Sequence, residues 1–458
     1  MEGAGLTRLI HNGAVTDLPR RGAKRTAKLV SLPLGMAGRG AIGLGKRVGG
    51  APAEAVAAEL QARTAEQLFA VLGELKGGAM KFGQAMSVME AALPEEWIGP
   101  YRASLTKLQE AAPPLPPERV HAVLADELGP RWRSAKFADF DDIPSAAASI
   151  GQVHKATWRD GRTVAVKIQY PGAREALLSD LTQISRVARV AAGWVPGLDI
   201  KPIMAELRSR MSEELDYLME AGHQRAFADA FRGDPDFAIP EVVHATDKVL
   251  VSEWLPGVPL SRIIAEGDQE TRNAAAQLYL EFLLAGPVRS GQLHADPHPG
   301  NFRITPDGRL GVLDFGAVNR LPGGLPASIG ELLTFGLAGD ADGLLAGLRE
   351  LGFIKPSISV VPADLLGYLS MFIEPLTYET YRFDRAWLRS ISLRMNDVRR
   401  PEWAVGMKLN LPPDYLLIHR TWLGGIGVLC QIGGELSPRD ALARYLPGFD
   451  ITAIPPGR

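Results

Sequence analysis

The chain has 458 residues, of which 46% are hydrophobic and 22% charged, and its net charge is −2. This composition is typical of a globular protein, and the length leaves room for more than one domain. The single cysteine, Cys430, excludes an intramolecular disulfide and is expected to be a buried apolar residue. No uncharged apolar run reaches the about 18 residues needed to cross a bilayer, and residues 1–20 lack the pattern of a secretory signal, so a cytoplasmic location is expected.

Residues 1–50 are predicted to form a flexible, basic tail rich in Gly and Ala. They contain nine Lys or Arg residues and two acidic residues, which gives a net charge of +7. Two interpretations are open. The segment is a solvated tail, or it makes a peripheral contact with an anionic membrane surface through apolar residues such as Leu29, Leu32 and Met36. Nucleic-acid binding is not expected, because no aromatic residue lies among these charges.

Residues 51–115 are predicted to be a helical extension that ends in a proline-rich linker. Within it, residues 75–84 contain three glycines, and each weakens a helix by about 1 kcal/mol relative to alanine. Close approach of another backbone or a ligand would explain them. Lys81 and Gln84 lie on one helical face, on either side of Gly83, so both polar groups can reach the same point. The alternative is that both side chains are solvated.

Residues 116–255 have the pattern of a β-rich lobe. A strand at 153–158, a turn at Asp160-Gly161 and a returning strand at 163–169 predict a β-hairpin. The segment before the hairpin is an expected loop made of Ala146, Ala147, Ala148 and Ser149. This order, with Lys167 near the end of the second strand, is how the small lobe of a kinase covers nucleotide phosphates. Ordinary kinases have glycines in that loop, so the alanines predict a stiffer one.

Two further features of this lobe fit a nucleotide site. The segment from Pro202 to Glu220 carries acidic residues at helical spacing, and a kinase needs one glutamate there to hold the phosphate-binding lysine. The candidate glutamates are Glu214 and Glu220, which point in different directions around a helix, and Asp216 lies between them. The apolar strand at 249–257 ends in Pro-Gly and suits a hinge, where the backbone around Glu253 would hold adenine.

Residues 256–440 are predicted to be a helical C-lobe, followed by a tail at 441–458. Residues 293–301 and 312–316 carry two motifs in the order that phosphoryl transfer requires. Asp296 would orient the attacking oxygen, and Asn301 and Asp314 would hold Mg²⁺ on ATP. A metal site made of His294 and His298 is not expected, because the prolines between and after them disfavour a helix.

These motifs together resemble the UbiB-type (AarF-like) family of atypical kinases, from about Ala53 to about Leu436. The resemblance implies an α+β, bilobal protein-kinase-like fold with an N-terminal helical extension over the nucleotide site. It also implies that Lys81 and Gln84 contact Glu214, Asp216 or the nucleotide, and that Glu220 pairs with Lys167. Family members use ATP and are linked to isoprenoid quinone and other lipid metabolism. The membrane-spanning segments of some members are not found in this sequence.

Three functions are compatible with the sequence. The first is an Mg·ATP-dependent atypical kinase or ATPase with a lipid or quinone precursor as its partner. The second is a small-molecule kinase resembling aminoglycoside and choline phosphotransferases, whose loops have a similar His-x-Asp pattern. The third is a nucleotide-sensing scaffold without phosphoryl transfer. The sequence predicts neither the phosphoryl acceptor nor the oligomeric state.

Overall fold

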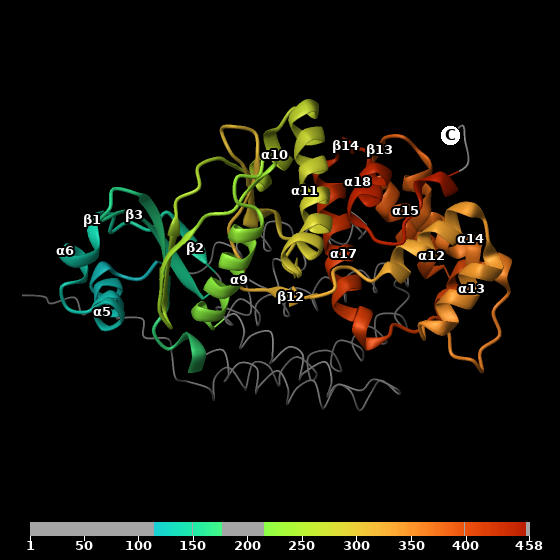
Figure 1. Cartoon of the computed structure of the whole chain (residues 1–458), viewed down its shortest axis with the longest axis horizontal. Coiled ribbons are helices and arrows are strands. Elements are labelled where there is room, and N and C mark those ends of the chain that lie inside the picture. The colour runs from blue at the N-terminus through green and yellow to red at the C-terminus, as the bar shows by residue number, and fades with distance from the viewer. Residues whose placement is uncertain (1–113, 149, 176–214, 398, 455–458) are drawn as a thin grey trace, which may run out of the picture. The chain divides into compact units, whose positions relative to one another are not determined.

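The structure, a computed structural model, describes residues 114–148, 150–175, 215–397 and 399–454 (Figure 1). Nearly all of these residues belong to one compact unit, formed by residues 79–170 and 209–458, and this unit is described below. Several of the predicted site residues lie outside the described residues. They are Lys81, Gly83, Gln84, Ser149 and Glu214.

The β-rich part of the unit is an antiparallel sheet with the order β1-β3-β4-β7-β6, in which the short strand β2 pairs with β3. Helix α5 (Pro117–Leu128) packs on one face through Val120 and Leu124, and the short helix α6 (Trp132–Lys136) adds Trp132 to the same core. The strands are β1 (Phe137–Phe140), β2 (Ala146–Ala148), β3 (Gly151–Trp158), β4 (Thr163–Gln169), β6 (Val242–Ala245) and β7 (Val249–Glu253).

The predicted hairpin is present as β3 and β4, joined by a tight turn in which Gly161 has a φ of 92°. The strand β4 has a clear alternation of side chains. Val164, Val166 and Ile168 are fully buried in the core beneath α5, so Lys167 leaves the opposite face of the sheet. The alternation therefore aims the lysine away from the hydrophobic core.

The alanine segment differs from the expected loop. Ala146, Ala147 and Ala148 form strand β2, in antiparallel register with Val153, Gln152 and Gly151. Alanine, unlike glycine, disfavours positive φ, and the extended conformation lets this segment pair with β3. The residues expected to cover phosphate are thus held in a second hairpin.

Helix α9 (Tyr217–Ala230) follows and contains the C-terminal end of the predicted acidic segment at 202–220, of which residues 202–214 lie outside the described residues. Asp216 is its N-cap, and the carboxylate accepts a hydrogen bond of 2.9 Å from the backbone N–H of Met219. An aspartate at this position satisfies one of the free N–H groups of the first turn. The cap fixes where the helix starts and so places Glu220 on its first turn.

A second, four-stranded sheet has the order β5-β11-β10-β8 and begins the helical part. Its strand β5 precedes β7, and the chain reaches the other three strands through the hinge after β7, where Gly257 has a φ of 147° and lies against Ile304. A Cβ at Gly257 would stand 2.4 Å from the carbonyl oxygen of Ile304, so only glycine fits. The strands are β5 (Phe237–Ala238), β8 (Val258–Pro259), β10 (Phe302–Ile304) and β11 (Leu310–Val312).

The long helix α11 (Gln269–Ser290) organises the helical part, and Figure 1 shows it beside α9 and α18 (Pro438–Tyr445). Its middle is almost wholly buried, from Tyr279 to Pro287, which agrees with the apolar helix predicted at 274–285. Two short strand pairs complete this region. They are β9 (Gln292–His294) with β12 (Val318–Arg320), and β13 (Tyr381–Arg382) with β14 (Glu435–Leu436).

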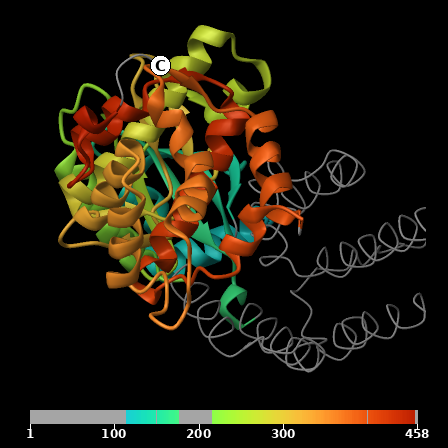
Figure 2. The same ribbon diagram turned by 90° about the vertical axis from the view of Figure 1, so that its right-hand side faces the viewer.

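The C-terminal helices come to the front in Figure 2. The predicted core helix is α17 (Pro413–Ile432), whose C-terminal half is buried and includes Cys430 at 2% exposure, as expected. Among the residues that the structure describes, no helix is long and apolar enough to span a membrane. The remaining helices are α10 (Leu260–Glu266), α12 (Ala327–Ala338), α13 (Ala341–Glu350), α14 (Pro362–Ile373), α15 (Arg385–Asn396) and α16 (Pro401–Gly406).

The chain after α18 packs closely on α12 at two glycines. A Cβ at Gly330 would lie 2.2 Å from the carbonyl oxygen of Pro447 and 2.4 Å from the backbone nitrogen of Phe449. Gly448 has a φ of 76°, and a Cβ there would lie 2.3 Å from the carbonyl oxygen of Ala327. Backbone meets backbone at this contact, so neither position has space for a side chain.

Candidate functional site

Lys167 joins two carboxylates that come from different parts of the chain. Its Nζ donates to Glu220 Oε1 at 2.7 Å and Oε2 at 2.9 Å, and to Asp314 Oδ2 at 3.2 Å. The side chain is 17% exposed, that of Glu220 2% and that of Asp314 34%. The structure therefore contains the ion pair between Lys167 and Glu220 that the family resemblance implied, and it adds Asp314 as a second partner.

The electrostatics of this cluster follow from burial and charge together. Burial opposes the charge of Lys167, but the carboxylates of Asp314 and Glu220 outweigh it and hold the pKa of the lysine well above its usual value. Burial raises the pKa of Glu220 to about 7, against the attraction of Lys167, which lowers it. Lys167 is thus a fixed positive charge whose companion carboxylate on α9 titrates near neutrality.

The aromatic ring of Tyr217 lies against the ammonium group of Lys167, and this contact was not predicted from the sequence. Lys167 Nζ lies 5.2 Å from the centroid of the Tyr217 ring, and this side chain is fully buried. A cation over an aromatic face is attracted to it, so the ring favours the charged lysine. Tyr217 is the first residue of α9, one turn before Glu220. That spacing on one helical face is the signal that could have identified it.

Asp314 follows strand β11 and is held by the backbone that comes after it. Its Oδ1 accepts a hydrogen bond of 2.9 Å from the N–H of Gly316. A Cβ on Gly316 would stand 3.2 Å from that Oδ1 and 3.7 Å from Glu220 Oε2, so the glycine lets the two carboxylates approach one another. The second oxygen of Asp314 faces Lys167.

His294 fixes the backbone of the same motif. Its Nε2 is 2.5 Å from the carbonyl oxygen of Asp314, and its ring packs against Phe282, Phe302 and Phe315. The imidazole is 1% exposed. This agrees with the predicted packing role for His294, and the described residues contain no group of His, Cys, Asp and Glu that could hold a metal ion by itself.

The loop that carries Asp296 and Asn301 is tied at both ends. Asn301 Nδ2 donates to the carbonyl oxygen of Asp296 at 3.2 Å, and the buried hydroxyl of Tyr279 on α11 donates to the carbonyl oxygen of Pro297 at 2.8 Å. The backbone N–H of Leu313 donates to the carbonyl oxygen of Asn301 at 3.0 Å. This last bond connects the two predicted motifs directly.

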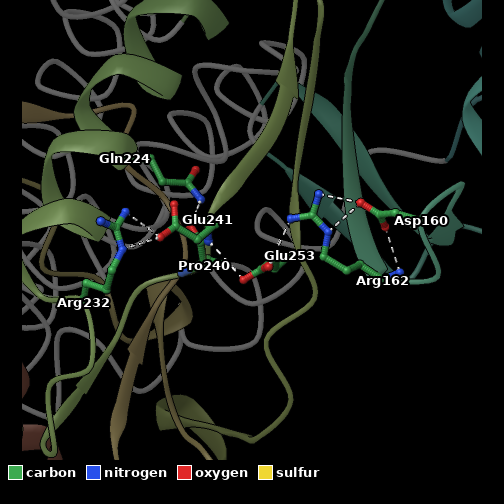
Figure 3. A network of polar contacts seen from close by, with 7 residues as sticks. All are labelled: Asp160, Arg162, Gln224, Arg232, Pro240, Glu241 and Glu253. Carbon is green, nitrogen blue, oxygen red and sulfur yellow. Dashed lines mark hydrogen bonds and ion pairs between the residues drawn. The ribbon is translucent and has the colours of Figure 1, made fainter.

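Glu253 ends strand β7 at the hinge, and its side chain belongs to a surface network (Figure 3). Its Oε1 accepts from Arg162 Nη1 at 3.3 Å, and Arg162 also binds Asp160 in the β3–β4 turn. The backbone N–H of Glu253 donates to the carbonyl oxygen of Glu241 at 2.9 Å. The carboxylate of Glu253 is therefore engaged by the hairpin turn, which leaves the hinge backbone as the expected contact for a base.

Of the predicted site residues in the described part of the chain, Lys167, Glu220 and Asp314 are brought into direct contact, and Asn301 is joined to Asp296. Asp216 caps α9 and is exposed, and its contact with Lys81 or Gln84 stays a prediction.

The donor set suits a magnesium nucleotide. Mg²⁺ prefers oxygen ligands and is commonly held by one or two protein groups together with phosphate oxygens. The carboxylate of Asp314 and the amide oxygen of Asn301 are such ligands. Lys167, which is charged and lies beside Asp314, can neutralise phosphate oxygens bound to the same ion.

Comparisons with known proteins show which proteins this chain is similar to. Residues 107–346 match the model of the ABC1 atypical kinase-like domain. The chain is 31% identical over 299 residues to the mitochondrial atypical kinase COQ8B of Danio rerio, covering 64% of this chain and 47% of that protein. It is 31% identical over 287 residues to mitochondrial COQ8 of Saccharomyces cerevisiae, covering 61% and 56%. The chain thus spans about half the length of these relatives.

A solved structure gives a broader match. Rv3197 of Mycobacterium tuberculosis, determined in complex with erythromycin, is 42% identical, with a TM-score of 0.68 over 88% of this chain and 100% of that one. The kinase-like fold predicted from the sequence is therefore confirmed. The chain belongs to the ABC1 atypical kinase-like family, which includes the COQ8 and UbiB-type proteins.

Proposed function

We propose that the protein binds Mg·ATP and uses it as an atypical phosphotransferase or ATPase. The observation that supports this most is the contact of Lys167 with both Glu220 and Asp314. Three separate elements, β4, α9 and the segment after β11, converge on one ammonium group, and a structural ion pair would need only two. Family membership supports the same proposal, because the relatives are named atypical kinases.

Each residue would have a separate task when nucleotide is bound. Asp314 and Asn301 would hold Mg²⁺, which supplies charge neutralisation at the phosphates. Lys167 would contact phosphate oxygens, with Glu220 and the Tyr217 ring holding its ammonium in place. Asp296 would orient the hydroxyl or water that attacks, and its backbone is already fixed by Asn301. The alanine strand β2 would lie over the phosphates.

The test compares Asp314→Asn with Asp307→Asn by thermal shift, with ATP present and Mg²⁺ added or omitted. Asp307 is an exposed aspartate paired with Arg309 on the β10–β11 turn, so its variant is a matched control. Asp314→Asn should lose the Mg²⁺-dependent part of the stabilisation, because an amide is a weaker metal ligand, while Asp307→Asn keeps it. Equal Mg²⁺-dependent shifts in the two variants would refute the magnesium assignment.

The acceptor is proposed to be a lipid or quinone precursor, or water. The names of the relatives support a kinase-like activity and do not identify a substrate. Incubation with Mg·ATP and candidate polyprenyl-quinone precursors, followed by product analysis, distinguishes transfer from hydrolysis. A phosphorylated precursor would support transfer. Release of inorganic phosphate at the same rate with and without the precursor would support an ATPase.

A second candidate is macrolide binding. It is supported by the 42% identity to Rv3197, which was solved in complex with erythromycin. Calorimetric titration with erythromycin, repeated in the presence of saturating Mg·ATP, tests it. Heat of binding in the first titration supports this candidate, and its loss in the second indicates that the two ligands compete.

A further inference from the structure

Arg303 occupies an unusual place between the hinge and the metal-binding motif. It is the middle residue of β10, opposite Pro259 of β8 and Gly311 of β11. Phe302 is extended, with φ −125° and ψ 151°, and its side chain is fully buried in the core. Because side chains alternate along extended backbone, Arg303 leaves the other face of this strand. Arg303 therefore points away from that core, two residues after the predicted magnesium ligand Asn301.

The guanidinium of Arg303 is bonded to the hinge. Nη1 donates to the carbonyl oxygen of Leu255 at 2.5 Å. The side chains of both residues meet above Gly311, where a Cβ would stand 2.4 Å from Leu255 Cδ2 and 3.1 Å from Arg303 Cγ. The missing side chain at Gly311 is what lets the hinge lie directly on the arginine. Any ligand held by the hinge backbone would be next to this side chain.

A second donor of the same guanidinium lacks an acceptor. Within the described part of the chain, Nε of Arg303 is buried and has no hydrogen-bond partner. A buried charged donor without an acceptor is unfavourable, so an acceptor atom supplied by a ligand would be bound tightly.

We infer that Arg303 recognises the nucleoside half of the nucleotide. Nη1 holds the hinge in place, and Nε donates to an acceptor oxygen or nitrogen on the ribose or the base. The inference rests on the proposed function, and it divides the site in two. Lys167 and Asp314 act on the triphosphate and its metal, whereas Arg303 acts on the nucleoside.

The experiment measures three probes separately by calorimetry: Mg·ATP, adenosine, and Mg-tripolyphosphate, which has no nucleoside. Arg303→Met keeps the stem and removes every donor. This variant should bind Mg·ATP and adenosine about tenfold more weakly, equivalent to about 1.4 kcal/mol. Its affinity for Mg-tripolyphosphate should change by less than about twofold. Arg309→Met, which removes a guanidinium from the same hairpin, should change none of the three affinities.

Arg303→Lys keeps the positive charge but offers one ammonium in place of two separated donors. The affinity for adenosine should fall by about threefold or more, because one ammonium cannot donate to the hinge carbonyl and to the nucleoside with the geometry of the guanidinium. If Arg303→Met does not fold, this variant decides the question. Unchanged adenosine affinity in a folded Arg303 variant would overturn the inference, as would equal losses for adenosine and Mg-tripolyphosphate. Wild-type protein that binds none of the probes would instead overturn the proposed function.

Discussion

Lys167 and Glu220 form a buried ion pair, and the loss of one partner leaves the other charge without compensation. Breaking such a pair typically destabilises a protein by about 3–5 kcal/mol. We expect Glu220→Gln to approach the lower figure, because Asp314 remains as a second carboxylate for Lys167. Urea unfolding measures the change. The affinity for Mg·ATP should also fall, since the ammonium is no longer held on the side of α9.

Glu241→Gln is the control for this variant. Glu241 also pairs with a basic residue, Arg232, but both side chains are largely exposed, and exposed ion pairs contribute little. The control should keep nearly the wild-type stability and nucleotide affinity. If Glu220→Gln behaved like Glu241→Gln in both measurements, the ion pair on α9 would have no part in holding Lys167.

At the scale of elements, a series of buried hydrogen bonds connects strand β3 to neighbouring segments. Gln152 accepts from the backbone N–H of Leu115 at 2.7 Å and is 2.8 Å from His154 Nε2, and His154 Nδ1 is 2.8 Å from the carbonyl oxygen of Asp141. With Nδ1 donating to the carbonyl, Nε2 accepts from the amide of Gln152. Protonation of the imidazole would place two donors face to face.

This arrangement predicts a pH dependence of stability. Burial is the first cause that lowers the pKa of His154 below its usual 6.5, so the unfolded chain binds the proton more readily than the folded one. The stability contributed by the neutral imidazole is present above pH 6.5 and is lost as the pH falls below that value. Urea unfolding at pH 7.5 and pH 5.5, about one unit on either side, measures the loss.

His154→Leu supplies the comparison. Its free energy of unfolding should be lower than that of the wild type at both pH values, but should fall less between pH 7.5 and pH 5.5. Glu220 titrates in the same range with the opposite sign. Its raised pKa adds stability at low pH that is lost as the pH rises towards about 7. Glu220 is present in both proteins, so the difference between them isolates His154. An identical pH dependence in the two proteins would contradict the role of this imidazole.

Strand β2 makes a different prediction for the alanine segment. Ala147 pairs with Gln152, and replacing it by glycine should weaken this short strand by about 0.5–1 kcal/mol through backbone entropy. We expect Ala147→Gly to change ATP turnover and nucleotide affinity, because the segment can then leave its extended conformation. Steady-state hydrolysis and calorimetry measure the two effects. Unchanged values for both would show that the stiffness of β2 does not influence nucleotide handling.

The sequence predicted those elements best whose pattern is local. The β3–β4 hairpin follows from its alternating strands and the Asp160-Gly161 turn, and α11 and α17 follow from long apolar segments. The start of α9 at its N-cap Asp216 was not predicted. The strand conformation of Ala146–Ala148 was also missed, since pairing with β3 is a tertiary effect that propensity does not show.

The candidate site was predictable to the extent that its residues belong to linear motifs. Asp296, Asn301 and Asp314 could be assigned from two short segments, and Glu220 required the family resemblance. Tyr217 and Arg303 were not found. Tyr217 could have been found from its spacing to Glu220 on one helical face, whereas the position of Arg303 depends on where the hinge lies on β10, which no local pattern encodes.

At the scale of the whole molecule, the basic tail at residues 1–50 has two interpretations, a solvated segment or a peripheral contact with anionic membranes, and the second is a proposal that can be tested. Its +7 charge would be attracted to acidic lipid by about 1 kcal/mol for each basic residue near the surface. Sedimentation with phosphatidylserine-containing vesicles should recover the full chain, and recovery should fall when residues 1–50 are removed or the salt concentration is raised. Equal recovery of the two proteins would rule out this role for the tail.

The contact between Gly330 and Gly448 has a consequence for how mutational data on this protein should be read. Both positions meet the backbone of the opposing segment and have no space for a side chain. In a saturation library, no substitution at these two glycines should be tolerated, and a catalytic residue would give the same result. Selection for nucleotide binding would then score them beside Asp314, although they lie on α12 and after α18. An abundance measurement in the same library would separate the two classes, because only the glycine variants should lose folded protein.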